Sequence, residues 1–356
     1  PTPARYLAAG AALGLALAVK YAAALLTPLL AMAHWHALRG LRDGRARRAA
    51  HGWLAAALAA AAAVFVALNP YLLRAWDSFA RDLGFQTRYV EAGHADGTAI
   101  GLRDYGGAFG LWYGLAPGLT LPVLAAALGG AAAAWRSGVA GRLAAGWPLL
   151  LYGALELSPA KPFPFFARYL QPAAPALCVL AALGLRRAAA AGSGRQWRRW
   201  GAGVWTALAV LWPLAKSAGI VAAAVSDTRE AAAVWMEQRL PSGTRVWVVT
   251  PHGPYYGSAR LAFTRGGVPN PEALRAQGIA YAVTTSFYTD RLRRMGARSR
   301  EPALTERANL ERLEAEAEVA AEFRPRWAWQ SYGFHNPVVR IYRLRPSGAP
   351  GESVAP

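Results

Sequence analysis

The sequence predicts a mainly α-helical, polytopic membrane protein that ends in a soluble α/β domain. Hydrophobic residues make up 54% of the 356 residues and charged residues only 17%, below the roughly 25% charged fraction of soluble domains. Apolar runs fill the first 225 residues and are separated by short, arginine-rich loops. The remaining third is more polar and alternates short β-branched runs with charged, helix-like segments.

About six apolar runs have the length of membrane spans or come close to it, since roughly 20 apolar residues cross a bilayer. The predicted spans are 7–32, 52–70, 112–134, 143–157, 169–185 and 202–225. The fourth and fifth are short and flank a proline-rich link. We therefore expect a transmembrane region at 1–225, a soluble α/β domain at 226–345 and a disordered tail at 346–356.

Loop charge predicts the orientation of the spans, because Lys and Arg concentrate on the cytoplasmic side. Arginines are frequent in the loops 35–51, 135–142 and 186–200, whereas the loop 71–110 balances its charges and the link 158–168 holds only Lys161 and Arg168. We expect a multi-pass protein of the cytoplasmic membrane whose 71–110 loop, 158–168 link and C-terminal domain are extracytoplasmic. Nucleic acid is not an expected partner, because a nucleic-acid-binding domain gathers its basic residues on one face.

The C-terminal domain shows alternating helix and strand signals. Asp227 with Glu230 three residues later is a helix-start signal. Helices are predicted at 228–240, 271–277 and 302–318, and strands at 245–250, 280–286, 318–323 and 338–344. Such alternation predicts a layered α/β domain.

Several stretches resemble one family. They are the run 9–30 with its Lys20-Tyr21 pair, the outer-loop stretches 69–71, 79–83 and 93–94, the run 165–175 (FFARYLQPAAP), and the tail stretches 227–246, 274–286 and 340–344. In order and spacing they resemble the GT-C membrane glycosyltransferases, most closely bacterial relatives of the dolichyl-phosphate-mannose protein mannosyltransferases in glycosyltransferase family thirty-nine.

The resemblance implies transfer of a sugar from a polyprenyl-phosphate carrier to a glycan, lipid or protein acceptor at the outer face of the membrane. It also implies an acidic catalytic base in a first outer loop, upstream of the equivalent of Pro1. We therefore expect a C-terminal portion of a longer enzyme and assign no catalytic residue within the chain. No cofactor is assigned, and a divalent metal ion is left open.

Four residues are candidates for binding the phosphate of the lipid donor: Arg168, Tyr169, Lys161 and Lys20. Arginine suits phosphate because its planar fork donates two hydrogen bonds at once, although Arg168 also fits an interfacial arginine that snorkels to headgroups. Tyr169 is placed at the donor by the resemblance, and otherwise fits an aromatic belt. Lys20 interrupts an apolar run, where a charge is costly and suggests function, unless the helix breaks there and brings it to a surface. Glu156 is a candidate partner of Lys161 or Arg168.

A second possible site lies in the outer loop, where Asp77, Glu91 and His94 are acidic or metal-ligating residues. A spacing of three has geometric meaning only on a helix, so a solvated loop is an equal explanation. Trp76, Phe79, Leu83 and Phe85 would form the apolar face of a helix on the membrane surface. In the tail, the aromatic turns 252–257 and 331–337 would contact an acceptor or are ordinary turns.

Two other function classes remain open. A non-catalytic membrane protein could use its outer domain to bind a partner or polysaccharide. A transporter is less favoured, because the chain has no inverted repeat or matching pair of interrupted spans. The sequence has no nucleotide-phosphate loop, serine elbow or zinc-helix motif.

Overall fold

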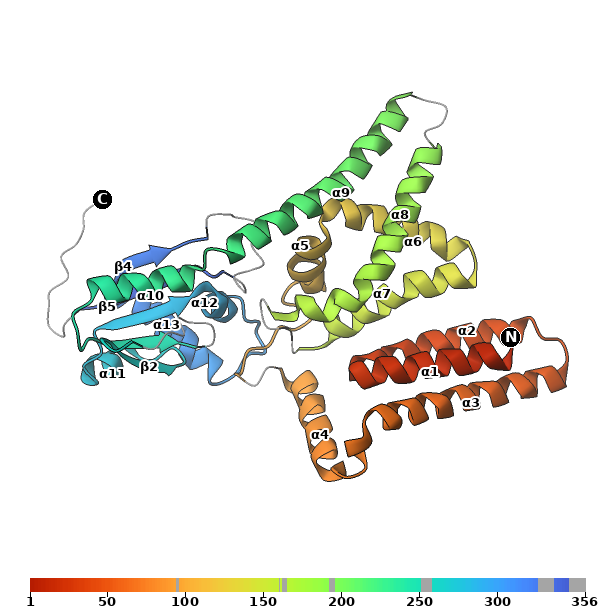
Figure 1. The fold of residues 1–356 in the computed structure, drawn as a ribbon, viewed down its shortest axis with the longest axis horizontal. Helices are drawn as coiled ribbons and strands as arrows, with labels where there is room; N and C mark the ends of the chain where they lie inside the picture. Colours follow the sequence, from red (N-terminus) through yellow and green to blue (C-terminus); the bar gives the residue numbers. More distant parts are fainter. Residues whose placement is uncertain are drawn as a thin grey trace. The chain divides into compact units, whose positions relative to one another are not determined.

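The computed structural model describes residues 1–93, 96–159, 161, 165–191, 196–250, 258–325 and 336–345 (Figure 1). The chain divides into two compact units, which are described separately. The helical unit comprises Pro1–Arg88, Leu119–Leu155 and Tyr169–Ala209, and the sheet unit comprises Tyr89–Gly118, Glu156–Arg168 and Val210–Pro356. The unit that holds the sheet is therefore larger than the 226–345 domain, since it also takes in the end of the 71–110 loop and the 158–168 link.

Several apolar helices are long enough to cross a membrane. Among the described residues these are the stretches Gly44–Leu68, Arg168–Ala190 and Trp200–Arg239. A fourth is added if Leu111–Leu119 and Leu121–Arg136, which meet at 99°, form one bent span. Six spans are not confirmed. The run 143–157 falls in α7 (Val139–Leu157), which holds an internal proline and is not among these stretches.

The run 7–32 is not one span. Helix α1 (Pro3–Val19) ends at Lys20, whose backbone is extended (φ −159°, ψ 125°). A 3₁₀ segment, η1 (Tyr21–Leu26), leads into α2 (Thr27–Arg39). Because the Nδ1 atom of His34 lies 2.6 Å from the hydroxyl of Tyr6, α2 runs back along α1. The prediction of a single span was wrong here, and its alternative, a helix break at Lys20, is confirmed.

The rest of the helical unit is also helical. Its other elements are α3 (Gly44–Leu68), η2 (Pro70–Leu72), most of α4 (Trp76–Ala92), α6 (Leu121–Arg136), α7, part of η4 (Phe165–Ala173), α8 (Ala174–Ala191) and the start of α9 (Gln196–Ala224). Asp43 caps α3 by accepting hydrogen bonds from the backbone amides of Arg45 and Ala46, as expected for an N-cap aspartate.

Small residues set the closest helix contacts. A Cβ atom on Gly10 of α1 would overlap the backbone of Ala57 in α3, and one on Gly14 would overlap Ala61 one turn further on. The two helices therefore run parallel. This spacing of four is the small-residue pattern that lets helix backbones approach closely in membranes, where packing rather than the hydrophobic effect drives association.

Helices α6 and α8 use the same device. A Cβ atom on Gly130 would overlap the carbonyl group of Leu180, and one on Gly184 would overlap Ala126. Thr120 precedes α6 with φ 70° and ψ 153°, a positive φ that is a genuine outlier for a β-branched residue. It is the residue at which the bend between Leu119 and Leu121 occurs.

The sheet unit contains a five-stranded mixed sheet with helices on both faces (Figure 1). Its regular elements include η3 (Leu111–Leu115), α5 (Ala116–Leu119), α10 (Thr228–Arg239), β1 (Arg245–Val249), β2 (Ala262–Gly266), α11 (Pro271–Ala276), β3 (Tyr281–Thr285), α12 (Ser286–Arg293), α13 (Ala303–Glu316), β4 (Ala317–Phe323) and β5 (Val339–Leu344). The strand order is β2-β1-β3-β5-β4, with β1 parallel to β2 and β3, and β5 antiparallel to β3 and β4. The α/β prediction is confirmed within the described residues, and β2 and α12 are additions to it.

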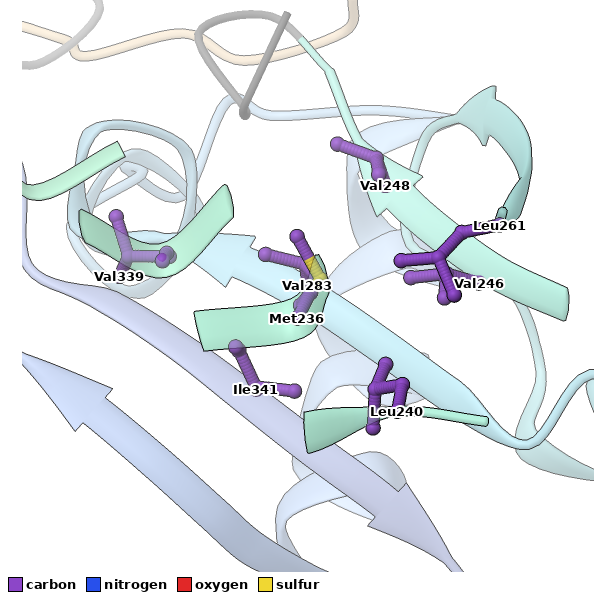
Figure 2. Packing of buried hydrophobic residues seen from close by; sticks show 9 residues of the cluster. Met236, Leu240, Val246, Val248, Leu261, Val283, Val339 and Ile341 are labelled. Atoms are coloured by element: carbon purple, nitrogen blue, oxygen red, sulfur yellow. The ribbon is translucent and has the colours of Figure 1, made fainter. Parts of the chain in front are cut away.

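Helix α10 covers one face of the sheet (Figure 2). Ala232 and Met236 of α10, and Leu240 directly after it, recur at intervals of four and are buried against strand residues that include Val246 and Ile341. Burying such side chains contributes roughly 1.5–3 kcal/mol each. The opposite face is covered by α11 and α13, through residues such as Leu274 and Leu313, so strand alternation places one set of side chains on each face.

A buried asparagine joins the end of α9 to the sheet. The Oδ1 atom of Asn336 accepts hydrogen bonds from the amide (2.8 Å) and hydroxyl (2.6 Å) groups of Thr228. Its Nδ2 atom donates to the carbonyl groups of Ala223 (2.9 Å) and Ser226 (2.8 Å). Asn336 thus satisfies a carbonyl in the last turn of α9 and the first amide of α10, groups that helix ends leave without intrahelical partners, as well as the Ser226 carbonyl between the two helices.

Replacing Gly130 with valine should weaken the α6–α8 pair. The new side chain would overlap the Leu180 carbonyl, and overpacking of this kind costs about 2 kcal/mol. Unfolding of the purified chain in mixed micelles by dodecyl sulfate, followed by far-UV circular dichroism, should show the loss. Gly129→Val is the matched control, because a Cβ on Gly129 meets nothing within 4 Å. Equal loss in both variants would contradict close packing at Gly130.

Replacing Asn336 with alanine should loosen the junction of α9, α10 and the sheet. Four hydrogen bonds are lost and buried groups are left unpaired, at a cost of about 3 kcal/mol. Hydrogen exchange measured by mass spectrometry should show faster exchange in α10 and β5. Asn309→Ala removes one hydrogen bond, to the Val268 carbonyl, and should have a smaller, local effect. Unchanged exchange in α10 would contradict the role of Asn336.

Candidate functional site

The break at Lys20 brings two of the predicted phosphate-binding residues together. The Nζ atom of Lys20 lies 4.0 Å from the centroid of the Tyr169 ring, which is within cation–π range. Lys20 is exposed and Tyr169 is half-buried. The residues are 149 positions apart in the sequence, and only the turn between α1 and η1 lets the lysine reach the ring.

Tyr169 is held in place by its neighbours in the 3₁₀ segment η4. Leu170 and Ala173, which follow it in the sequence, are buried. The indole nitrogen of Trp147 in α7 donates a 2.8 Å hydrogen bond to the Pro172 carbonyl, a backbone group for which the proline-interrupted segment offers few helical partners. Arg168, which directly precedes Tyr169, has an exposed side chain. A cation and a phenol are therefore adjacent, with a second cation next in the chain.

Aromatic side chains extend from the residue after Lys20. The ring of Tyr21 makes edge contacts with Phe65 of α3 (6.2 Å) and with Phe79 of α4 (6.0 Å). Trp76 lies 5.5 Å from Phe79. Trp76 and Tyr21 are exposed apolar side chains, and an exposed apolar surface of this kind beside a cation suits an amphiphile with a charged head. The contact of Phe79 with Tyr21 agrees with the apolar helix face predicted at Trp76, Phe79, Leu83 and Phe85.

Lys161 is part of a different cluster. Its ammonium group lies 3.5 Å from the carboxylate of Glu156 and donates to the Glu156 carbonyl. The two residues are only 2% and 4% exposed. Burial lowers the pKa of Lys161, although the Glu156 carboxylate acts in the opposite direction. Lys161 thus pairs with Glu156, as anticipated from the sequence. Its buried ammonium group is not accessible to a lipid phosphate.

Charged side chains also form hydrogen bonds at both ends of the apolar stretch Leu111–Leu119, which precedes the bend. At its start, Glu156 accepts a 2.5 Å hydrogen bond from the amide of Gly110. Near its end, the ammonium group of Lys216 in α9 donates to the Pro117 carbonyl. An anion at the N-terminus and a cation at the C-terminus match the helix dipole. Glu156 and Lys216 therefore stabilise an interrupted helix, whose first turn is a π-helix (Leu111–Leu115).

The structure does not bring the outer-loop candidates together. Asp77 lies in the first turn of α4, where an acid favours the helix dipole, and Glu91 lies in its last turn, about 20 Å along the axis. His94 falls outside the described residues, as do the turns 252–257 and 331–335. Among the described residues, no group of three or more His, Cys, Asp or Glu side chains is placed to hold a metal ion.

One contributor was missed at the level of sequence. Lys216 is a lysine within the predicted span 202–225, so the cost of an intramembrane charge would have singled it out as it did Lys20. Glu156 was singled out as a partner for a cation, but its hydrogen bond with the amide of Gly110 was not predicted, because that contact joins residues 46 positions apart through the fold.

Comparisons with protein-family models, with characterised proteins and with solved structures yield no match. The resemblance to GT-C glycosyltransferases therefore rests on the motifs themselves.

Replacing Lys161 with methionine should destabilise the sheet unit strongly. Breaking a buried pair leaves an uncompensated carboxylate, at a cost of about 3–5 kcal/mol. The double variant Glu156→Gln with Lys161→Met should lose less, because the neutral amide can still accept from Gly110. Dodecyl sulfate unfolding would compare the three proteins. Arg307→Met, which removes an exposed pair with Glu311, is the control. A double variant no better than Lys161→Met alone would contradict the pairing.

Proposed function

We propose that this chain is part of a membrane glycosyltransferase that receives its sugar from a polyprenyl-phosphate donor, with Lys20 and Arg168 binding the donor phosphate and the ring of Tyr169 holding Lys20. The observation that carries the proposal is the placement of the Lys20 ammonium over the Tyr169 ring. The two residues come from motifs that independently resemble the same enzyme family.

The chemistry of these residues suits a lipid phosphate. A cation close to the departing phosphate stabilises the negative charge that builds on it as the sugar leaves. Tyr169 holds the ammonium by its ring and leaves the donor N–H groups of Lys20 for an anion. The exposed aromatic residues around Tyr21 would contact the first isoprene units. A break in an apolar helix is also a common place for such a site, since irregular backbone at membrane depth occurs where it lines a cavity or is buried in protein.

The sheet unit supports the proposed sidedness. It combines the end of the 71–110 loop, the 158–168 link and the sheet itself, and the amide of Ile100 donates to the Pro159 carbonyl at 3.0 Å. Charge distribution placed all three segments outside the cytoplasmic membrane independently. Segments in direct contact must lie on one side of the bilayer, so the agreement supports an extracytoplasmic sheet unit.

The donor site can be tested by binding. Arg168→Ala and Lys20→Met should each reduce the affinity of the purified chain for a polyprenyl phosphate by roughly 10- to 100-fold, the range expected for charged hydrogen bonds. Affinity for the corresponding polyprenol should not change. Tyr169→Phe should bind normally and Tyr169→Leu weakly, because the ring holds the lysine. Intrinsic tryptophan fluorescence in detergent would report the binding.

Arg186→Ala, an exposed arginine at the other end of the same candidate span, is the control and should bind normally. Equal affinity of the unaltered chain for phosphate and alcohol would contradict the proposal. The alternative of a non-catalytic membrane protein whose outer domain binds a partner or polysaccharide would then be favoured.

A further inference from the structure

Two segments far apart in the sequence are joined within the sheet unit. The amide of Arg300 donates to the Gly97 carbonyl at 2.9 Å, and that of Gly296 to the Ala99 carbonyl at 2.8 Å. The hydroxyl of Ser299 bonds both the amide and the carbonyl of Ala99, at 3.0 Å each. These backbone contacts fix residues 97–104 against residues 296–300, so side chains from both segments share one surface.

Three arginines of these segments, Arg103, Arg298 and Arg300, are exposed. We refer to them as the arginine face. The side chain of Arg298 passes Gly101, with its Cδ atom 3.6 Å from the position of a Cβ there. None of the three forms an ion pair with any residue that the structure describes. The arginine face is therefore a local excess of positive charge, with three exposed arginines beside the exposed carboxylate of Asp104.

The nearby carboxylates already have partners within the sheet unit. Asp104 accepts hydrogen bonds from the amides of Gly101 (2.6 Å) and Ala297 (3.3 Å). Asp96 forms an ion pair with buried Arg291 and accepts from Thr98. These acids hold the two segments together, and their oxygen atoms face backbone groups and Arg291. An external anion would thus meet the arginines without displacing an internal pair.

The arginine face adjoins the start of an apolar helical stretch. The Nη1 atom of Arg294 donates to the Tyr113 hydroxyl at 3.1 Å, and the Tyr105 hydroxyl donates to the Arg294 carbonyl at 3.0 Å. Tyr113 belongs to the stretch Leu111–Leu119, where Trp112 is 55% exposed. Tyr and Trp are enriched at the level of lipid headgroups. Leu102, next to Arg103, is a further exposed apolar side chain.

We propose that the arginine face binds the phosphodiester headgroups of anionic phospholipids in the surrounding bilayer. Arginine forms paired hydrogen bonds with phosphate oxygens, and basic residues at the edge of a span are attracted to anionic lipid surfaces. The arginine face shares no residue with the proposed donor site and does not depend on glycosyl transfer. The arginine face thereby attaches the sheet unit to the bilayer electrostatically, in addition to the covalent connection between this unit and the candidate spans.

The test measures lipid binding by the full chain. The purified protein is titrated in detergent with phosphatidylglycerol or with phosphatidylcholine, and bound lipid is counted by native mass spectrometry. The unaltered protein should prefer phosphatidylglycerol. Arg103→Gln, Arg298→Gln and Arg300→Gln combined should reduce that preference by roughly 10- to 100-fold. The matched control combines Arg239→Gln, Arg307→Gln and Arg343→Gln, which removes three exposed charges elsewhere on the same unit and should retain the preference.

Each other result would overturn the proposal. Equal loss in both triple variants would indicate net charge rather than a defined surface. An unchanged preference in the arginine-face variant would show that other residues select the lipid. Displacement of phosphatidylglycerol by millimolar inorganic phosphate would indicate a site for free phosphate instead of a lipid headgroup. Lys20→Met and Arg168→Ala should keep the lipid preference, so failure of the donor-site proposal would be distinguished from failure of this one.

Discussion

Interruptions of apolar helices are the constraint on which much of this structure depends. Within hydrocarbon, the amide and carbonyl groups at a helix end have no water to bond, so a break must be supplied with partners from the protein. The chain provides them with charged side chains: Glu156 at the amide of Gly110 and Lys216 at the carbonyl of Pro117. At the break after α1 the residue itself is charged, since it is Lys20, and the Tyr169 ring holds its ammonium group. Charges that would be costly in a continuous helix thus become the means of ending one.

Close helix packing and the buried side chain of Asn336 hold the elements around these breaks together. Gly10, Gly14, Gly130 and Gly184 allow backbone contact that any side chain would prevent. In the sheet unit, Asn336, which lies shortly before β5, forms hydrogen bonds with the end of α9, the start of α10 and the link between them. The end of α9 is therefore joined to α10 by hydrogen bonds through Asn336 as well as by a short connection.

The sheet unit also includes segments that connect the helices. It binds the end of the 71–110 loop through Asp96, Ala99 and Asp104, and the link at Pro159 through Ile100. Loop, link and sheet consequently form one body at the proposed outer face. The two proposed anion-binding sites differ in their chemical surroundings. Lys20, Tyr169 and Arg168 offer a small site beside an apolar surface, whereas the arginine face is an open surface suited to many headgroups.

The sequence by itself determined the features that depend on local pattern and composition. Apolar length predicted several of the candidate spans, Asp227 predicted the start of α10, and β-branched runs predicted β1, β3, β4 and β5, because these signals lie within a few consecutive residues. Tertiary structure alone decided what depends on distant contacts. The run 7–32 folds back at Lys20, the weakly patterned β2 forms a strand by pairing with β1, and Lys161 turns to Glu156 while Lys20 reaches Tyr169. A single side chain has several possible partners along a sequence, and only packing in three dimensions selects one.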